Sequence, residues 1–176
     1  LTIQQTYLHW RQLEEQIQWC DDRIAAHLKQ DEQAQQAVKV IGVGPLTASA
    51  VVATVSDLKQ FKNGAQFGAW IGLTPRQHSS GGKNKLGRIT KHGDTYLRTL
   101  LIQGAKTAVL SAHKRDDPIS QWVCRLRARA GWQIAAVALA NKNARILWAV
   151  LAKGTPYDAR HVSVMPTGEC LNSVAA

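Results

Sequence analysis

The stretch Thr74–Leu101, TPRQHSSGGKNKLGRITKHGDTYLRTLL, decides how the rest of the chain can be arranged. Its first half is crowded with residues that favour turns and positive φ, so it predicts a loop rather than a helix or a strand. From Gly93 onwards the apolar residues change to a helical spacing, and Asp94 stands where a helix N-cap is expected. The stretch therefore predicts a glycine-rich loop over 74–93 that leads into a helix over 94–113.

The predicted loop is strongly cationic and holds a serine pair, Ser79 and Ser80, beside two glycines. No acidic residue precedes Asp94 in this stretch. Backbone N–H groups and cations held together in such a loop can bind a phosphate. The candidate phosphate-binding residues are Arg76, Lys83, Lys85, Arg88 and Lys91, with Arg98 facing solvent on the helix that follows.

The charge of the whole chain supports the same interpretation. The formal net charge is +10, but residues 1–38 carry three basic and six acidic side chains, whereas residues 75–115 carry nine basic and one acidic. A cationic patch of this kind is typical of proteins that bind nucleic-acid phosphates. The three cysteines are far apart and form no zinc-binding pattern, so no metal site is expected. We also expect no membrane-spanning segment.

The run Gly72–Ala105, GLTPRQHSSGGKNKLGRITKHGDTYLRTLLIQGA, resembles the C-terminal transposase domain of the DEDD-type insertion-sequence transposases. This family includes the pilin-gene DNA invertases and bridge-RNA-guided recombinases. The resemblance extends from the first predicted helix to about Tyr157. It implies that the serine of a Ser-Gly pair is the catalytic nucleophile. That serine corresponds here to Ser80, or to Ser79 if the alignment is shifted by one residue.

The resemblance also implies what lies outside this sequence. In the family, divalent metal is bound by the carboxylates of a RuvC-like N-terminal domain, which nothing in this sequence matches. We therefore expect no cofactor in this chain and Mg²⁺ in that absent domain. The chain is expected to be the C-terminal portion of a transposase that is inactive alone. DNA is the expected partner, with a guide (bridge) RNA as a further one, in the bacterial cytoplasm at the nucleoid.

Residues 1–37 are predicted to form one long helix, because residues 2–37 lack glycine and proline and are rich in Gln, Glu and Ala. Ile3, Trp10, Ile17 and Ile24 recur every seven residues, as in a coiled coil. The alternative is an amphipathic helix packed on its own domain. The resemblance favours the coiled coil, through which the protein would form a homo-oligomer.

Residues 38–55 predict a helix-hairpin-helix. One helix is expected to end at Gly42, and a second begins after Gly44, with Pro45 in its first turn. Such a turn exposes N–H groups that can bind a DNA phosphate without reading bases. The predicted contacts are Gly42, Gly44 and Thr47. The alternative is a tight helical hairpin used only for packing.

The remaining sequence predicts further helices and no strand. Asn63 is expected to cap a helix that ends at Gly72, and Asp117 a helix that begins at Pro118 and ends near Ala130. Residues 132–152 predict a buried helix, and residues 158–176 a flexible tail. The fold class is therefore all-α: a long N-terminal helix, then a compact helical domain over 38–157.

The residues alone support a phosphate-binding loop, and two functions remain open for it. The one that the resemblance implies is DNA transposition by site-specific recombination, in which Ser80 attacks a DNA phosphate and His78 or His92 accepts its proton. The other is a non-enzymatic helix-hairpin-helix module that only binds nucleic acid. Replacement of Ser80 separates them, because it abolishes recombination only in the first.

Overall fold

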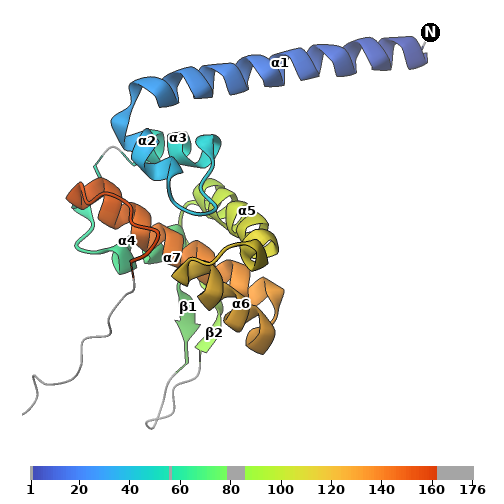
Figure 1. Ribbon diagram of the computed structural model, residues 1–176. Coiled ribbons are helices and arrows are strands. Elements are labelled where there is room, and N and C mark those ends of the chain that lie inside the picture. Colours follow the sequence, from blue (N-terminus) through green and yellow to red (C-terminus); the bar gives the residue numbers. More distant parts are fainter. Residues whose placement is uncertain (1, 56, 79–85, 162–176) are drawn as a thin grey trace, which may run out of the picture.

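The computed structural model describes residues 2–55, 57–78 and 86–161, and it confirms the all-α class (Figure 1). Helices occupy most of the described chain, with short 3₁₀ turns at Leu58–Gln60 and Ala112–Lys114. The α-helices are α1 (Thr2–Gln30), α2 (Glu32–Val38), α3 (Pro45–Thr54), α4 (Gly64–Ile71), α5 (Thr95–Ser111), α6 (Pro118–Ala130) and α7 (Trp132–Lys153).

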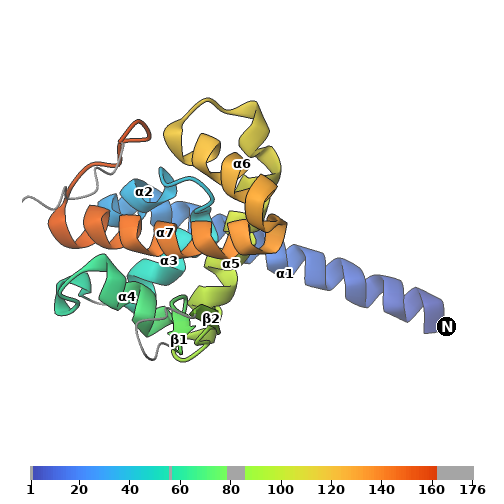
Figure 2. The ribbon, with the colours of Figure 1, turned by 90° about the horizontal axis from the view of Figure 1, so that it is seen from below.

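Helix α7 is the centre of the compact domain, and α4, α5 and α6 pack around it (Figure 2). Its Leu139 and Leu147 are almost completely buried. Buried Asn143 donates a hydrogen bond from Nδ2 to the Ile41 carbonyl at 2.7 Å. Trp148 donates from Nε1 to the Leu58 and Phe61 carbonyls, at 3.1 and 3.0 Å. These bonds fix the preceding loops to α7.

Helix α7 is long and apolar enough to cross a membrane, judged by length and composition alone. No such segment was expected from the sequence. Half of the most apolar window of α7 is buried inside the domain. The apolar composition of α7 is explained by its position in the core, because a helix surrounded by other helices is apolar on most of its faces.

Helices α2 and α3 form a helical hairpin that packs against α5. The first helix ends at Val38 rather than at Gly42, so the predicted boundary is wrong. Gly42 lies in the turn with a φ of +78°. A Cβ atom on Gly42 would lie 2.8 Å from the carbonyl oxygen of Gly104, and one on Gly104 would lie 1.9 Å from that of Gly42. The turn and α5 therefore meet backbone to backbone.

The long N-terminal helix is interrupted, which corrects the single helix predicted for residues 1–37. Asp31 lies between α1 and α2 with extended backbone, and its Oδ1 accepts a hydrogen bond from the Ala34 N–H at 3.0 Å. Asp31 thus acts as the N-cap of a new helix within a run that favours helix throughout.

Helix α1 projects away from the domain (Figures 1 and 2). Ile3, Trp10 and Ile17 are 87%, 51% and 61% exposed. Only near its C-terminal end do Ile24 and Leu28 become partly buried, where α1 contacts α2 and α3. The alternative of a helix packed along its own domain is therefore wrong for most of α1. The coiled coil stays a prediction.

Two short strands correct the expectation that no strand is present. β1 (Pro75–Gln77) and β2 (Leu86–Ile89) pair antiparallel, with Pro75 opposite Ile89 and Gln77 opposite Leu86. The register shifts between these pairs, as in a β-bulge. Both strands are largely exposed. The stretch predicted as a loop is therefore a β-hairpin at its described ends.

The predicted helix caps of the compact domain are confirmed. Asn63, Asp94 and Asp117 each accept a backbone N–H hydrogen bond from the residue three positions later. Partial burial raises the pKa of Asp117, but hydrogen bonds from Ser120 and Arg115 outweigh that effect and hold the pKa below its ordinary value.

The sequence predicts a flexible tail over residues 158–176. Of these, residues 162–176 lie outside the described part of the chain.

We predict that Gly104→Ala destabilises the fold by about 1–3 kcal/mol, because the new Cβ collides with the Gly42 carbonyl. At an unobstructed helix position the same change would stabilise by roughly 0.5–1 kcal/mol. Urea unfolding followed by far-UV circular dichroism measures the difference.

The matched control is Gly44→Ala. Gly44 has a φ of −90° and no heavy atom within 4 Å of an added Cβ. Its replacement should change stability by less than about 1 kcal/mol. Equal stabilities for the Gly104 variant and the unmodified chain would contradict the close packing of α5 on the hairpin.

Candidate nucleic-acid interface

The β1–β2 hairpin is attached to the domain by a contact between two backbones. Gly72 ends α4 with a φ of +81°, and Gly93 precedes α5 with a φ of +105°. A Cβ on Gly72 would lie 2.1 Å from the His92 carbonyl oxygen, and one on Gly93 would lie 1.7 Å from that of Trp70. Only glycine fits at both positions, because φ is positive and the space is filled.

Backbone hydrogen bonds continue from this contact into the strands. The Lys91 N–H donates to the Gly72 carbonyl at 3.2 Å, and the Thr90 N–H donates to the Thr74 carbonyl at 2.9 Å. Lys91 itself has a φ of +58°, the one positive φ of a non-glycine residue in the described chain. The base of the hairpin is therefore held at both of its strands.

Arg98 stabilises the same base from inside the domain, which corrects its prediction as a solvent-facing phosphate ligand. The residue is only 8% exposed. Its Nη1 donates to the Ile71 carbonyl at 2.9 Å, and its Nη2 donates to Thr95 Oγ1 at 3.0 Å. The guanidinium thus joins the end of α4 to the start of α5.

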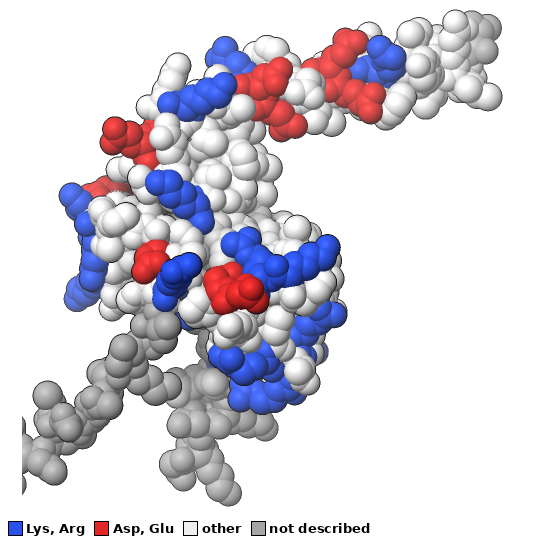
Figure 3. All heavy atoms as spheres, in the orientation of Figure 1, with Lys and Arg blue, Asp and Glu red and all other residues white. Residues whose placement is uncertain are grey.

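The exposed cations of the hairpin remain available to a ligand. Arg76 on β1, Arg88 on β2 and Lys91 after β2 are exposed, and none forms an ion pair with a carboxylate among the described residues. Arg76 has a long hydrogen bond, 3.4 Å, from Nη2 to the Thr90 carbonyl. Figure 3 shows Lys and Arg gathered on the lower part of the domain, whereas much of the acidic surface lies along α1.

Several predicted residues lie outside the described part of the chain, namely Ser79, Ser80, Lys83 and Lys85. The two histidines beside them are described, and both are exposed. The His78 ring lies across from Gly87, 3.6 Å from where a Cβ on that glycine would be. His92 contributes its backbone to the contact with Gly72. The role of either ring as a proton acceptor stays a prediction.

The residues predicted to contact nucleic acid in the helix-hairpin-helix differ in their exposure. Thr47 is 6% exposed, so its side chain lies in the core, and a contact through its backbone N–H stays a prediction. Gly42 is packed against α5. Gly44 is exposed at the N-cap of α3, and Pro45 and Leu46 after it are exposed as well. The open part of this hairpin is therefore the N-terminal turn of α3.

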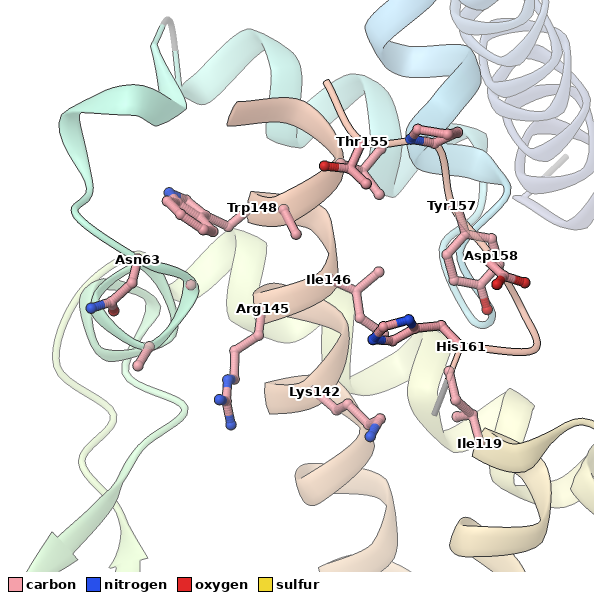
Figure 4. Close-up of a pocket in the computed structure, with 15 residues that line it drawn as sticks. Asn63, Ile119, Lys142, Arg145, Ile146, Trp148, Thr155, Tyr157, Asp158 and His161 are labelled. Atoms are coloured by element: carbon pink, nitrogen blue, oxygen red, sulfur yellow. The ribbon is translucent and has the colours of Figure 1, made fainter. Parts of the chain in front are cut away.

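Sequence reasoning did not identify a groove on the outer face of α7 (Figure 4). The groove has a volume of about 910 Å³ and contains two cations, Lys142 and Arg145. These residues are three positions apart in a helix that is otherwise mostly apolar. Two cations at helical spacing in an apolar helix were the signal for this groove in the sequence. The apolar residues of the same helix led us to predict only that it is buried.

Residues 35–120 match the family described as "Transposase IS116/IS110/IS902 family". The matched segment begins in α2, contains the β1–β2 hairpin and α5, and ends in the first turn of α6. The interface described above thus lies inside the matched segment, whereas the α7 groove lies mostly beyond it.

Similar curated proteins carry transposase names. The chain is 49% identical over 154 residues to "Probable family 20 transposase" of Pseudomonas aeruginosa, which covers 84% of the chain and 46% of that protein. It is 44% identical over 137 residues to "Transposase for insertion sequence element IS1111A" of Coxiella burnetii, covering 78% and 38%. It is 38% identical over 150 residues to "Transposase for insertion sequence element IS1328" of Yersinia enterocolitica, covering 85% and 45%.

These similarities support the expectation that the chain contains a transposase domain, and they indicate that it is of the IS110/IS116/IS902 type. The chain spans less than half the length of each of these relatives.

We predict that Arg98→Met destabilises the protein by about 1–3 kcal/mol, because the Ile71 carbonyl loses its buried donor. Methionine keeps much of the side-chain volume, so the loss is of hydrogen bonds rather than of packing. Urea unfolding provides the measurement.

Arg125→Met on exposed α6 serves as the control and should stay within about 0.5 kcal/mol of the unmodified chain. If the two variants unfold at the same urea concentration, Arg98 does not hold the base of the hairpin.

Proposed function

We propose that this chain is the DNA-holding portion of an insertion-sequence transposase that carries out DNA transposition by site-specific recombination. The observation that carries the proposal is a cationic β-hairpin on a rigid base, within the segment that matches a transposase family. A rigid base favours this chemistry, because a nucleophile and a phosphate must be held in a reproducible geometry.

In this proposal the exposed cations of the hairpin bind DNA phosphates. Arg76, Arg88 and Lys91 supply charge near the base. Lys83 and Lys85, which lie outside the described residues, add two cations in the sequence that connects the strands. Cations placed at a phosphate also stabilise the charge that develops on its oxygens during attack. The N-terminal turn of α3, with Gly44, gives a further backbone contact. Such contacts position DNA without reading its sequence.

We further propose Ser80 as the nucleophile, with Ser79 as the alternative. The hydroxyl oxygen attacks the phosphorus of a DNA phosphodiester and the bond from phosphorus to a sugar oxygen breaks. The sugar oxygen leaves as a hydroxyl by taking up, through a base, the proton that the serine loses. The product is a transient phosphoserine bond that joins the protein to one strand. The serine proton passes to a base, for which His78 and His92 are the candidates.

Metal chemistry is assigned to another domain. Among the described residues, no group of three or more His, Cys, Asp or Glu side chains could hold a metal ion. In the proposal, Mg²⁺ is bound by the RuvC-like domain that the resemblance implies, so strand exchange requires both parts. A guide RNA, as the resemblance also implies, would supply the sequence information that phosphate contacts lack.

Helix α1 is proposed to form a homo-oligomer through its heptad positions. Ile3, Trp10 and Ile17 are more than half exposed in the single chain. Pairing this face with the same face of a second copy would remove the apolar side chains from water.

The second candidate function is a nucleic-acid-binding module without catalysis. The exposed N-terminal turn of α3 and the cationic hairpin support it equally, because both concern phosphate binding alone. The two candidates differ only in the role of Ser80.

We predict that the triple variant R76Q/R88Q/K91Q binds a short DNA duplex more weakly than the unmodified chain. Three lost phosphate contacts should reduce the slope of log affinity against log salt by about 2–3. Fluorescence anisotropy over a salt series measures both quantities.

A triple variant on α6, R125Q/R127Q/R129Q, removes the same formal charge from exposed positions away from the hairpin. The proposal requires a smaller loss of affinity for this control. Equal losses would mean that only the total charge attracts DNA, and the hairpin would then be no specific interface.

A further inference from the structure

We propose that the groove on the outer face of α7 is a second contact for the DNA backbone, with Lys142 and Arg145 as its phosphate ligands. The inference rests on one part of the proposed function, namely that the chain binds DNA through the hairpin. It goes beyond that function by assigning a separate site, at the opposite end of α4 from the hairpin.

The groove is formed by four segments of the chain, one of which contributes Ile119 of α6 (Figure 4). Its floor is the C-terminal half of α7, with Arg145 and Ile146 among the residues that line it. Residues 63–65, at the start of α4, form one side. Residues 155–158 and His161, after the end of α7, form the other. At about 910 Å³ and open to solvent, the groove can receive a segment of an extended polymer.

The two cations of the groove are poorly compensated by the protein. Burial lowers the pKa of Lys142, and the neighbouring Arg145 guanidinium lowers that pKa further. Neither residue forms an ion pair with a carboxylate in the described ranges. The Lys142 ammonium lies 5.1 Å from the centre of the Trp122 ring, which offsets part of the repulsion. Figure 4 shows the two side chains diverging from α7, Arg145 towards α4 and Lys142 towards Ile119 of α6. An anionic polymer lying across the groove would offset the two charges with separate phosphates.

The acidic residue of the groove, Asp158, does not compensate Arg145. Asp158 lies in the segment after α7 and accepts a hydrogen bond on Oδ1 from the Arg160 N–H at 2.8 Å. Figure 4 shows Asp158 on the opposite side of α7 from Arg145, which extends towards α4. Positive charge therefore remains available on the α4 side.

Helix α4 brings its first turn against Arg145. A Cβ on Gly64 would lie 2.8 Å from the Arg145 Cα and 2.9 Å from its carbonyl oxygen, so the two backbones touch. Asn63 caps the helix through Oδ1, which accepts from the Gln66 N–H at 2.9 Å. The N-terminal end of a helix carries partial positive charge, which adds to that of the two side chains.

The position of the groove fits one duplex that reaches both sites. The groove begins at Gly64 and the hairpin base begins at Gly72, the two ends of α4. Eight residues of α-helix span roughly 12 Å. Base pairs rise about 3.4 Å each, so this distance corresponds to three or four base pairs of one duplex. A duplex lying along α4 would therefore bring phosphates to both ends of that helix, where the groove and the hairpin base lie.

The test compares K142Q/R145Q with R125Q/R129Q in binding to a short DNA duplex, using the 176-residue chain and fluorescence anisotropy. Two lost phosphate contacts should reduce the salt slope by about 2 and weaken binding on the order of tenfold in dilute salt. The α6 control, with equal charge change, should lose much less.

Exposed Arg145 provides a variant that keeps Lys142 intact. R145Q alone should reduce the slope by about 1, with an unchanged circular dichroism spectrum. An unchanged slope for R145Q and for the double variant, or an equal loss in the α6 control, overturns the inference. The inference is also overturned if the groove variants lose binding to an RNA duplex but keep their binding to the DNA duplex.

The hairpin variant R76Q/R88Q/K91Q separates this inference from the proposed function. If it loses affinity while the groove variants do not, the groove inference fails and the hairpin interface stands. If the groove variants lose affinity and the hairpin variant does not, the groove is the DNA contact and the hairpin proposal fails. Absence of DNA binding by the unmodified chain overturns both.

Discussion

The contact between the backbone at the end of α4 and the backbone before α5 is the constraint on which the hairpin depends. Gly72 and Gly93 allow this approach because neither has a side chain, and each meets a carbonyl oxygen of the other segment. Buried Arg98 then joins the same two segments by hydrogen bonds. The arrangement leaves exposed Arg76 and Arg88 on short strands whose base cannot shift freely. A rigid base beside exposed cations favours the positioning and stabilisation of a phosphate.

Local signals in the sequence were sufficient for much of the fold. An N-cap is a short-range interaction, so Asn63, Asp94 and Asp117 could each be recognised from the residues that follow them. Helical spacing of apolar residues correctly predicted the helix that forms α5, whose buried residues include Leu97 and Leu101. The same local information located the cationic stretch, because glycines, serines and cations were adjacent in the chain.

The features that sequence reasoning missed depend on contacts between distant residues. Arg98 faces inward because the Ile71 carbonyl, 27 positions earlier, needs a donor. Thr47 is buried because α3 lies against the rest of the domain. The strands form only because the two ends of the predicted loop meet. Asp31 was missed for another reason. Its N-cap hydrogen bond is a local interaction, but the residues on both sides of it favour a continuous helix.

The central claim is that the hairpin presents a serine to a DNA phosphate, and the most direct test is to trap a covalent protein–DNA adduct. Full-length protein would be incubated with Mg²⁺ and the DNA of its element, and the linked peptide mapped by mass spectrometry. The account predicts a bond to Ser80 that disappears in Ser80→Ala while DNA binding persists. A bond to Ser79 would keep the mechanism and shift the nucleophile by one residue. Recombination without any serine adduct would contradict the account and leave this chain a DNA-holding module.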